Sequence, residues 1–305
     1  MSGIAPLVIR ELQRADEATA VAVLTRALEA EVPYIATVAA EKVFGEGPPP
    51  ATTRRLGAWR GDELVGVAVL SGRWLRIGGV VPEARGAGVG TALLDEVVRV
   101  ARESGETRVR TGDQPGNYLT PGIDTRLRPT VKWLERRSFM RAGVNEDLIV
   151  PLAGNRLVTP ARVIAAVARA AQNGCEVRRA TPADGAALDA FVRTTFSPAW
   201  AFEVARALEA APGGVFLAAD DTAGIIGFAA HDGNNRGLGC FGPSGTLDQH
   251  RGKGIGQALL LSTLVELASD GHTDATIAWI GPRNFYERNC GAGQGSQYLV
   301  LERPI

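Results

Sequence analysis

A glycine-rich loop occurs twice in this chain, each time between a predicted strand and a predicted helix. The copies read Arg85-Gly86-Ala87-Gly88-Val89-Gly90 and Arg251-Gly252-Lys253-Gly254-Ile255-Gly256, and their arginines are 166 residues apart. A second pair of similar segments, around Arg10 and Arg178, has nearly the same offset of 168 residues. Two independent repeats at almost one offset indicate a duplicated domain.

The order of elements in the first copy follows from its apolar periodicity. The pattern predicts a strand at 7–13, helices at 16–30 and 34–44, two strands around a turn at 60–63, and a strand that ends at Val81. After the loop it predicts a helix, a strand at 107–111, a helix at about 126–138 and a last strand pair through 148–152. The second copy repeats this order from residue 176. We therefore predict an N-terminal domain at 1–153, a helical connector at 154–175 and a C-terminal domain at 176–305.

The connector carries signals at both ends of its helix. Thr159 is a side-chain N-cap, Pro160 suits the first helical turn, and Gly174 suits a left-handed C-terminal position. We expect this helix to pack on one domain or on both.

Charge and composition exclude several classes of partner. The 33 basic residues balance 33 acidic ones, so no net field favours a nucleic acid or an anionic membrane. No apolar run reaches the roughly 18 residues of a membrane span. The three cysteines, Cys175, Cys240 and Cys290, contain no C-x-x-C pair, and the three histidines show no H-x-x-x-H spacing. We predict an unexported cytoplasmic protein with no disulfide and no metal site.

The context of the two loops indicates an anion site. Glycines let a ligand approach the backbone, and the free N–H groups at a helix start favour a phosphate or pyrophosphate. The dinucleotide fingerprint requires a third glycine, but Thr91 and Gln257 occupy that position. The Gly-x-Gly-x-x-Gly at Gly237, Gly239 and Gly242 is followed by no predicted helix, which favours a glycine-rich strand. An ordinary tight turn is the competing interpretation of a single loop, and the repetition disfavours it.

On these motifs the chain resembles the GNAT N-acetyltransferase superfamily. The family signature is a strand, Arg/Gln-x-x-Gly-x-Gly/Ala, a helix, and an aromatic-Tyr pair on a later helix, which Phe285-Tyr286 matches. The resemblance covers nearly the whole chain. It implies an α/β (α+β) fold of two tandem GNAT-like domains, each with a mixed, mostly antiparallel central sheet flanked by helices.

The resemblance also assigns the cofactor site. Family members bind acetyl-CoA through the loop amides and through the strand before the loop. The corresponding residues of the first copy are Val80, Val81, Arg85, Gly86, Ala87, Gly88, Val89, Gly90 and Thr91. Those of the second copy are Thr246, Leu247, Arg251, Gly252, Lys253, Gly254, Ile255, Gly256 and Gln257.

The implied reaction is direct attack of a neutral amine on the thioester, with a hydroxyl that protonates the departing thiolate. Tyr286 matches the family's acid; packing at a helix interface is its alternative role. The first copy has Leu134 at that position, and Tyr118 is its replacement candidate or a packing anchor. His231 and Asp232 are the first candidates for the base, with a hairpin turn at 231–235 as the competing interpretation.

Two function classes remain open. One is an N-acetyltransferase that moves an acetyl group from acetyl-CoA to a primary amine of a small molecule. The other is a CoA-binding, sensing or scaffolding protein without turnover. The segment 279–286 is similar to tandem GNAT enzymes that acetylate amino sugars, which suggests that acceptor class. We expect either a monomer with pseudo-dimeric domains or a homodimer.

Overall fold

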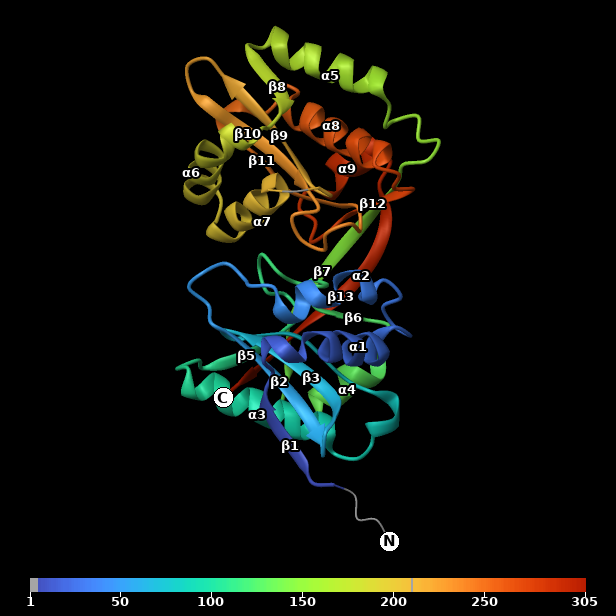
Figure 1. The fold of residues 1–305 in the computed structure, drawn as a ribbon. Helices are drawn as coiled ribbons and strands as arrows, with labels where there is room; N and C mark the ends of the chain where they lie inside the picture. Colours follow the sequence, from blue (N-terminus) through green and yellow to red (C-terminus); the bar gives the residue numbers. More distant parts are fainter. Residues whose placement is uncertain (1–4, 210) are drawn as a thin grey trace. The chain divides into compact units, whose positions relative to one another are not determined.

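The computed structural model describes residues 5–209 and 211–305 and divides the chain into two compact units (Figure 1). The N-terminal unit comprises Met1–Asn145 together with Gln297–Ile305, and the C-terminal unit comprises Glu146–Ser296. Residues 1–4, which the predicted N-terminal domain includes, lie outside the described residues. No helix in the described part of the chain has the length and apolar character that a membrane crossing requires.

The N-terminal unit is built on an antiparallel meander. Strands β1 (Leu7–Glu11), β2 (Thr53–Arg60), β3 (Glu63–Ser71) and β4 (Trp74–Val80) pair in sequence order, and β4 then pairs parallel with β5 (Arg108–Thr111). The helices are α1 (Glu17–Leu28), α2 (Ile35–Phe44), α3 (Val89–Glu103) and α4 (Arg128–Glu135). Strand β3 is buried from Leu64 to Ser71, as expected for a central strand that is covered on both faces.

Two glycines show which helix covers which face of this sheet. A Cβ atom at Gly66 would lie 3.0 Å from Leu93 of α3, whereas a Cβ atom at Gly79 would lie 2.8 Å from Ala27 of α1. Gly66 is the register partner of Val80, so Gly66 and Gly79 face opposite sides of the sheet. Helices α1 and α3 therefore pack on opposite faces, and the glycines allow both helices to approach closely.

The C-terminal unit repeats this plan. Strands β8 (Cys175–Arg179), β9 (Gly214–Asp220), β10 (Gly224–His231) and β11 (Cys240–Thr246) form the meander, and β12 (Asp274–Ile277) pairs parallel with β11. The helices are α6 (Gly185–Thr195), α7 (Pro198–Glu209), α8 (Ile255–Ser269) and α9 (Arg283–Cys290). Gly227 faces Leu259 of α8 and Gly245 faces Phe196, so this sheet is also covered on both faces. Two units of a mixed, mostly antiparallel sheet with flanking helices confirm the predicted fold class.

The domain boundaries differ from the prediction because the two copies exchange their last strands. Strand β7 (Met140–Pro151) was predicted to end the N-terminal domain, but its residues Leu148–Pro151 pair with β12 in the C-terminal unit. Strand β13 (Gly293–Pro304) ends the chain, and its residues Glu302–Pro304 pair with β5 in the N-terminal unit. A short strand, β6 (Ile123–Asp124), also pairs with β13. The division therefore falls at 145/146 and 296/297, not at 153/154 and 175/176.

The connector helix α5 (Pro160–Gln172) belongs to the C-terminal unit. Its Ala166 and Ala170 are buried in the same core cluster as Leu260 and Leu264 of α8. The predicted ends are confirmed: the Thr159 hydroxyl accepts from Arg162 N–H at 3.3 Å, and Gly174 has φ +74°. The connector is therefore an integral part of one unit.

The exchange predicts reciprocal effects of two buried leucines. Leu301 of β13 and Leu148 of β7 are both fully buried. We expect Leu301→Ala to cost about 2–5 kcal/mol of stability in the N-terminal unit, because a cavity replaces packed apolar atoms. Hydrogen exchange should then show faster opening at 108–111 but not at 274–277. Leu148→Ala is the matched control and should show the opposite pattern. The strand exchange would be contradicted if Leu301→Ala lowered protection in the C-terminal unit and Leu148→Ala lowered it in the N-terminal unit.

Candidate functional site

The two glycine loops have nearly the same backbone. Each follows a strand and a 3-10 turn, at Pro82–Ala84 in one unit and at Asp248–His250 in the other. The first and second glycines have φ values of +75° and +83° in one loop and +81° and +84° in the other, a conformation that favours glycine. Gly88 and Gly254 occupy the N-cap positions of α3 and α8. The unsatisfied N–H groups of the first helical turns therefore make each loop suited to an anion.

One edge of β11 is open beside the second loop. Strands β11 and β12 pair only at Cys240–Thr276 and Phe241–Ile277, after which β12 ends. Among the residues that the structure describes, 244–246 pair with β10 and no second strand pairs with 242–246, which we call the open edge. A Cβ atom at Gly242 would meet nothing within 4 Å. Backbone groups along the open edge are thus available to an extended ligand that reaches the loop.

Helix α9 holds Tyr286 against the open edge. Phe285 packs at 3.5 Å from the position of a Cβ atom on Gly256, and Gln257 Nε2 donates to Asn289 Oδ1 at 2.8 Å. These contacts tie α9 to the first turn of α8. The Tyr286 hydroxyl hydrogen-bonds the Ser244 side chain, and the Tyr286 ring stacks edge-on against Phe241 at 6.1 Å. Tyr286 is therefore fixed beside the middle of the open edge.

The Tyr286 hydroxyl is a proton donor in this environment. Its side chain is 8% exposed, and burial raises the pKa of Tyr286 above its ordinary value, with Ser244 opposing the shift. The phenol is therefore protonated at neutral pH. A protonated hydroxyl at this place can give a proton to an anion that forms beside β11.

The N-terminal unit has the same arrangement without the hydroxyls. Trp133 packs 3.5 Å from the position of a Cβ atom on Gly90, as Phe285 does on Gly256, and Arg137 donates to the Thr91 hydroxyl at 2.7 Å. The next residue is Leu134, which is 3% exposed. By strand register Gly78 corresponds to Ser244, because Trp74–Arg110 and Cys240–Thr276 are equivalent pairs. Both members of the Tyr286–Ser244 pair are thus absent at the equivalent positions.

A buried arginine takes the place of Gly242 in the N-terminal unit. Arg76 is 2% exposed, and its guanidinium donates to Gln114 Oε1, to Lys42 O at 3.2 Å and to Gly45 O at 2.6 Å. Tyr118, the predicted replacement acid, is 8% exposed and lies in the loop that carries Asn117. Asn117 is fully buried and accepts from Lys42 Nζ at 3.0 Å. Side chains of the protein itself therefore fill the region that is open beside Gly242.

The base role predicted for His231 and Asp232 is wrong. Both residues are fully buried, and the His231 ring bonds Asp232 Oδ2 at 3.2 Å and Glu266 Oε1 at 2.9 Å. Burial lowers the pKa of His231, but the two carboxylates outweigh it and raise the pKa to about 9. His231 is therefore protonated at neutral pH and has no free nitrogen. Glu266 lies in the last turn of α8, about 16 Å along the helix from the glycine loop.

Asp232 instead stabilises a turn, in agreement with the competing interpretation of 231–235 as a hairpin turn. Its φ is +52°, and its Oδ1 accepts from the N–H groups of Gly239 and Cys240 at 3.0 and 3.2 Å. The predicted glycine-rich strand is mostly part of this turn, because Gly237 and Gly239 precede β11 with positive φ. Only Gly242 of that run lies in a strand.

Basic groups gather at the second loop more than at the first. The Arg169 side chain of α5 lies 3.2 Å from the position of a Cβ atom on Gly254, and its Nη1 donates to Gln257 Oε1 at 3.2 Å. Lys253 and Arg251 are in the loop itself. In the first loop Ala87 replaces the lysine, and Arg85 donates to Val80 O and Ala27 O at 3.0 and 2.7 Å. Arg137 lies at Thr91 of the first loop as Arg169 lies at Gln257 of the second, and Arg251 pairs with Asp248 at 2.8 Å. The remaining difference is Lys253, which favours an anion at the second loop.

Two residues of this site, Ser244 and Arg169, were not predicted from the sequence, and a third, Trp279, was included only as part of the segment 279–286. Ser244 is two positions before Thr246 on β11, so strand alternation places it on the face of Thr246 and Gly227, which α8 covers. Arg169 comes from the connector, whose packing on α8 has no sequence signal. Trp279 follows β12, is 38% exposed, has φ +51°, and donates its backbone N–H to Asp147 Oδ1 at 3.0 Å.

Comparison with known proteins agrees with this geometry. Residues 24–118 match the family model described as the acetyltransferase (GNAT) family. No curated protein matches the chain in sequence. A tandem GNAT protein from the clavulanic acid biosynthesis pathway has a TM-score of 0.68 and 16% identity, with 98% of each chain covered. A GCN5-related N-acetyltransferase from Sphaerobacter thermophilus has a TM-score of 0.63 and 17% identity, with 98% of this chain and 96% of that chain covered.

A third structure contains a larger protein. It is described as a GCN5-related glucosamine N-acetyltransferase region in a fungal multi-domain GH3 β-N-acetylglucosaminidase, with a TM-score of 0.75 and 17% identity. The match covers 99% of this chain and 38% of that chain. These similarities extend the same two-unit fold over the whole length of this chain.

The His231 network predicts a pH-dependent stability. The pKa of His231 is raised from 6.5 to about 9, so its stabilising contribution is complete below about pH 6.5 and is lost as the pH rises through about 9. We expect His231→Gln to lower the free energy of unfolding by about 3 kcal/mol at pH 6.5, because it removes the cation from the buried Asp232 carboxylate. The difference should shrink towards pH 9.5 in urea titrations.

Asp189→Asn is the control for this experiment. It breaks an exposed ion pair with Arg193, and we expect a change of less than about 1 kcal/mol. If both variants lost the same free energy of unfolding at every pH, this result would contradict the stabilising role of the buried His231 network.

Proposed function

We propose that this chain, a member of the GNAT superfamily, is an N-acetyltransferase that moves an acetyl group from acetyl-CoA to a primary amine of a small molecule, and that the C-terminal unit performs the reaction. The observation that carries the proposal is the Tyr286–Ser244 pair beside the open edge of β11. It places a protonated hydroxyl where an extended ligand bound along the open edge would lie.

The second loop is the proposed phosphate site. The amides of 252–257 would bind the pyrophosphate of acetyl-CoA, and Lys253 and Arg169 add positive charge there. The pantetheine would run from the loop along Thr246 and Gly245 of the open edge, where backbone groups have no second strand. This path leads the thioester towards Ser244 and Tyr286.

The proposed chemistry needs no covalent intermediate on the protein. The neutral amine attacks the thioester carbonyl, so that a C–N bond forms while the C–S bond breaks. A backbone N–H of the open edge stabilises the oxyanion, since it is already oriented. Tyr286 then gives its proton to the departing thiolate. Its raised pKa keeps that proton in place until the thiolate forms.

We propose that the N-terminal unit does not catalyse this reaction. Leu134 and Gly78 replace the two hydroxyl-bearing residues, and Arg76 fills the region that corresponds to Gly242. Its loop retains the anion-binding backbone of Gly86–Thr91. This unit would therefore bind a CoA molecule without turnover or serve as a scaffold.

An amino sugar is the acceptor that we propose to test first. Trp279 is 38% exposed directly after β12, at the strand end where β11 and β12 part. An exposed indole can pack against the apolar face of a sugar ring, and its strained φ of +51° is held by the bond to Asp147. The structural similarity to a glucosamine N-acetyltransferase region supports the same acceptor class.

The cofactor site predicts a charge effect at Lys253. We expect Lys253→Glu to weaken acetyl-CoA binding at least about 10-fold, because a carboxylate replaces an ammonium beside the phosphates. Isothermal titration calorimetry measures this directly. Ala87→Glu places the same charge in the first loop. A larger loss of affinity in Ala87→Glu than in Lys253→Glu would assign the working site to the N-terminal unit and contradict the proposal.

The acid role predicts a specific loss in Tyr286→Phe. We expect kcat to fall about 100-fold, because the thiolate leaves without a proton donor, while the affinity for acetyl-CoA changes little. Release of CoA thiol is measured with glucosamine and, in parallel, with a peptide N-terminus. Unchanged kcat in Tyr286→Phe would contradict the acid role. Strong turnover of the peptide and none of glucosamine would contradict the acceptor class, and no thiol release with any amine would favour the non-catalytic alternative.

A further inference from the structure

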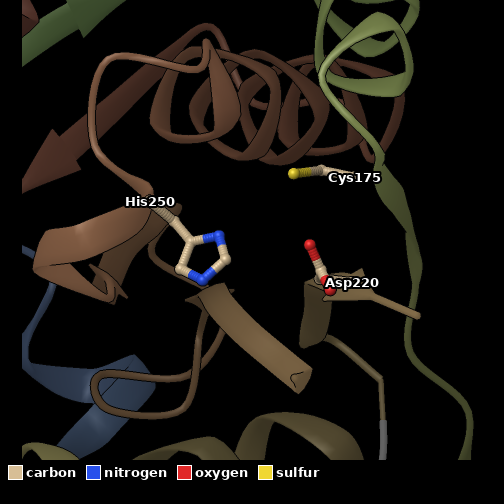
Figure 2. A group of neighbouring side chains, drawn as sticks. All are labelled: Cys175, Asp220 and His250. Atoms are coloured by element: carbon tan, nitrogen blue, oxygen red, sulfur yellow. The ribbon is translucent and has the colours of Figure 1, made fainter. Parts of the chain in front are cut away.

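Three side chains of different chemistry converge at one corner of the C-terminal unit. Cys175 begins β8, Asp220 ends β9, and His250 ends the 3-10 turn before the second glycine loop. Cys175 and Asp220 are register partners across the two strands. Figure 2 shows the thiol, the carboxylate and the imidazole directed into a common space. One ligand atom of each lies within 4.8 Å of the other two.

The carboxylate is held in one orientation by its own turn. Asp220 Oδ1 accepts from the Thr222 N–H at 2.9 Å, the Thr222 hydroxyl at 2.6 Å and the Ala223 N–H at 3.2 Å. These three hydrogen bonds all fall on one carboxylate oxygen and fix its orientation. With three donors on one oxygen, the other oxygen can bind a cation.

The three residues differ in burial, and the more exposed Asp220 leaves an entrance to the cluster. Cys175 is 1% exposed and His250 is 9% exposed, whereas Asp220 is half-buried. The Cys175 thiol makes only a long contact, 3.5 Å, with the carbonyl oxygen of Asn173. A cation would thus reach the cluster from the side of Asp220 and meet the thiol in a dry environment.

The charge next to the cluster is Lys253. Its Nζ lies 3.4 Å from His250 Nδ1, in contact with one of the three residues. A divalent ion at the cluster would displace this flexible side chain towards solvent.

We propose that Cys175, Asp220 and His250 bind a divalent cation of the zinc type. One sulfur, one nitrogen and one oxygen ligand form a donor set that zinc accepts in tetrahedral sites. Three protein ligands leave the fourth position to water. The thiol proton is released to solvent on binding, since the thiolate is the ligand.

A second group of side chains also converges in this unit and consists of His231, Glu266 and Asp270. By comparison, it is a poor cation site. Its histidine is protonated between two carboxylates, and Glu266 also pairs with Arg179 at 2.8 Å. Positive charge already occupies that cluster. The first group differs in its chemistry, because it contains a thiol and its histidine faces one carboxylate instead of two, and this supports the first group as the cation site.

The test is metal binding by the full chain under reducing conditions. After dialysis against a chelator, zinc is titrated in competition with a chromophoric chelator, and we expect about one equivalent to bind tightly. Cys175→Ser and His250→Gln should each weaken binding at least about 10-fold, because each removes one ligand. Cys240→Ser and His272→Gln are matched controls, since neither residue belongs to the cluster, and both should bind zinc as the wild type does.

Cobalt provides a second readout on the unaltered protein. Cobalt in place of zinc should give a thiolate-to-metal charge-transfer absorption in the wild type, and Cys175→Ser should lose it while circular dichroism shows an intact fold. The proposal is overturned if the wild type binds no zinc equivalent, if it shows no charge-transfer band, or if Cys175→Ser and His250→Gln bind as tightly as the controls. If a cysteine or histidine variant fails to fold, Asp220→Asn replaces it in the zinc titration.

Discussion

The short parallel pairing of β11 with β12 is the constraint on which the candidate site depends. Only two residue pairs join these strands before β12 ends, so no strand in the described part of the chain pairs with the backbone of 242–246 on that side. Unpaired backbone groups must be satisfied by a ligand or by water. The same strand leads directly into the glycine loop and the start of α8. One extended ligand can therefore satisfy both the open edge and the helix terminus, and Tyr286 lies beside its path.

The two units share one frame but differ in the side chains of the candidate site. Both retain the left-handed glycines, the aromatic residue packed on the loop and the polar link from the helix start to the following helix. The differences are single side chains: Leu134 for Tyr286, Gly78 for Ser244 and Arg76 for Gly242. The frame is set by backbone geometry and packing, which tolerate such changes. The proposed proton transfer depends on individual hydroxyl groups, so the same changes would remove it.

Sequence reasoning located the loops and Tyr286 because their signals are local. A glycine needed at φ near +80° and an aromatic pair on a short helix are visible within a few residues. His231 and Asp232 were assigned wrongly because their polarity at a strand end suggests either a site or a turn, and only the position of Glu266, 35 residues later, decides. Ser244, Arg169 and the Cys175–Asp220–His250 cluster were missed since each depends on neighbours from other elements.

The sequence by itself determined the duplication, the order of elements within each copy and the two glycine loops, because periodicity and left-handed glycines are properties of short segments. Only the tertiary structure decided that β7 and β13 are exchanged between the units, since a strand's own residues do not specify which equivalent sheet it joins. Tertiary structure also decided that Ser244 pairs with Tyr286 beside the open edge and which polar groups are paired in the interior. Those properties depend on burial and on contacts between residues far apart in the chain, such as Arg76 with Gln114 and His231 with Glu266.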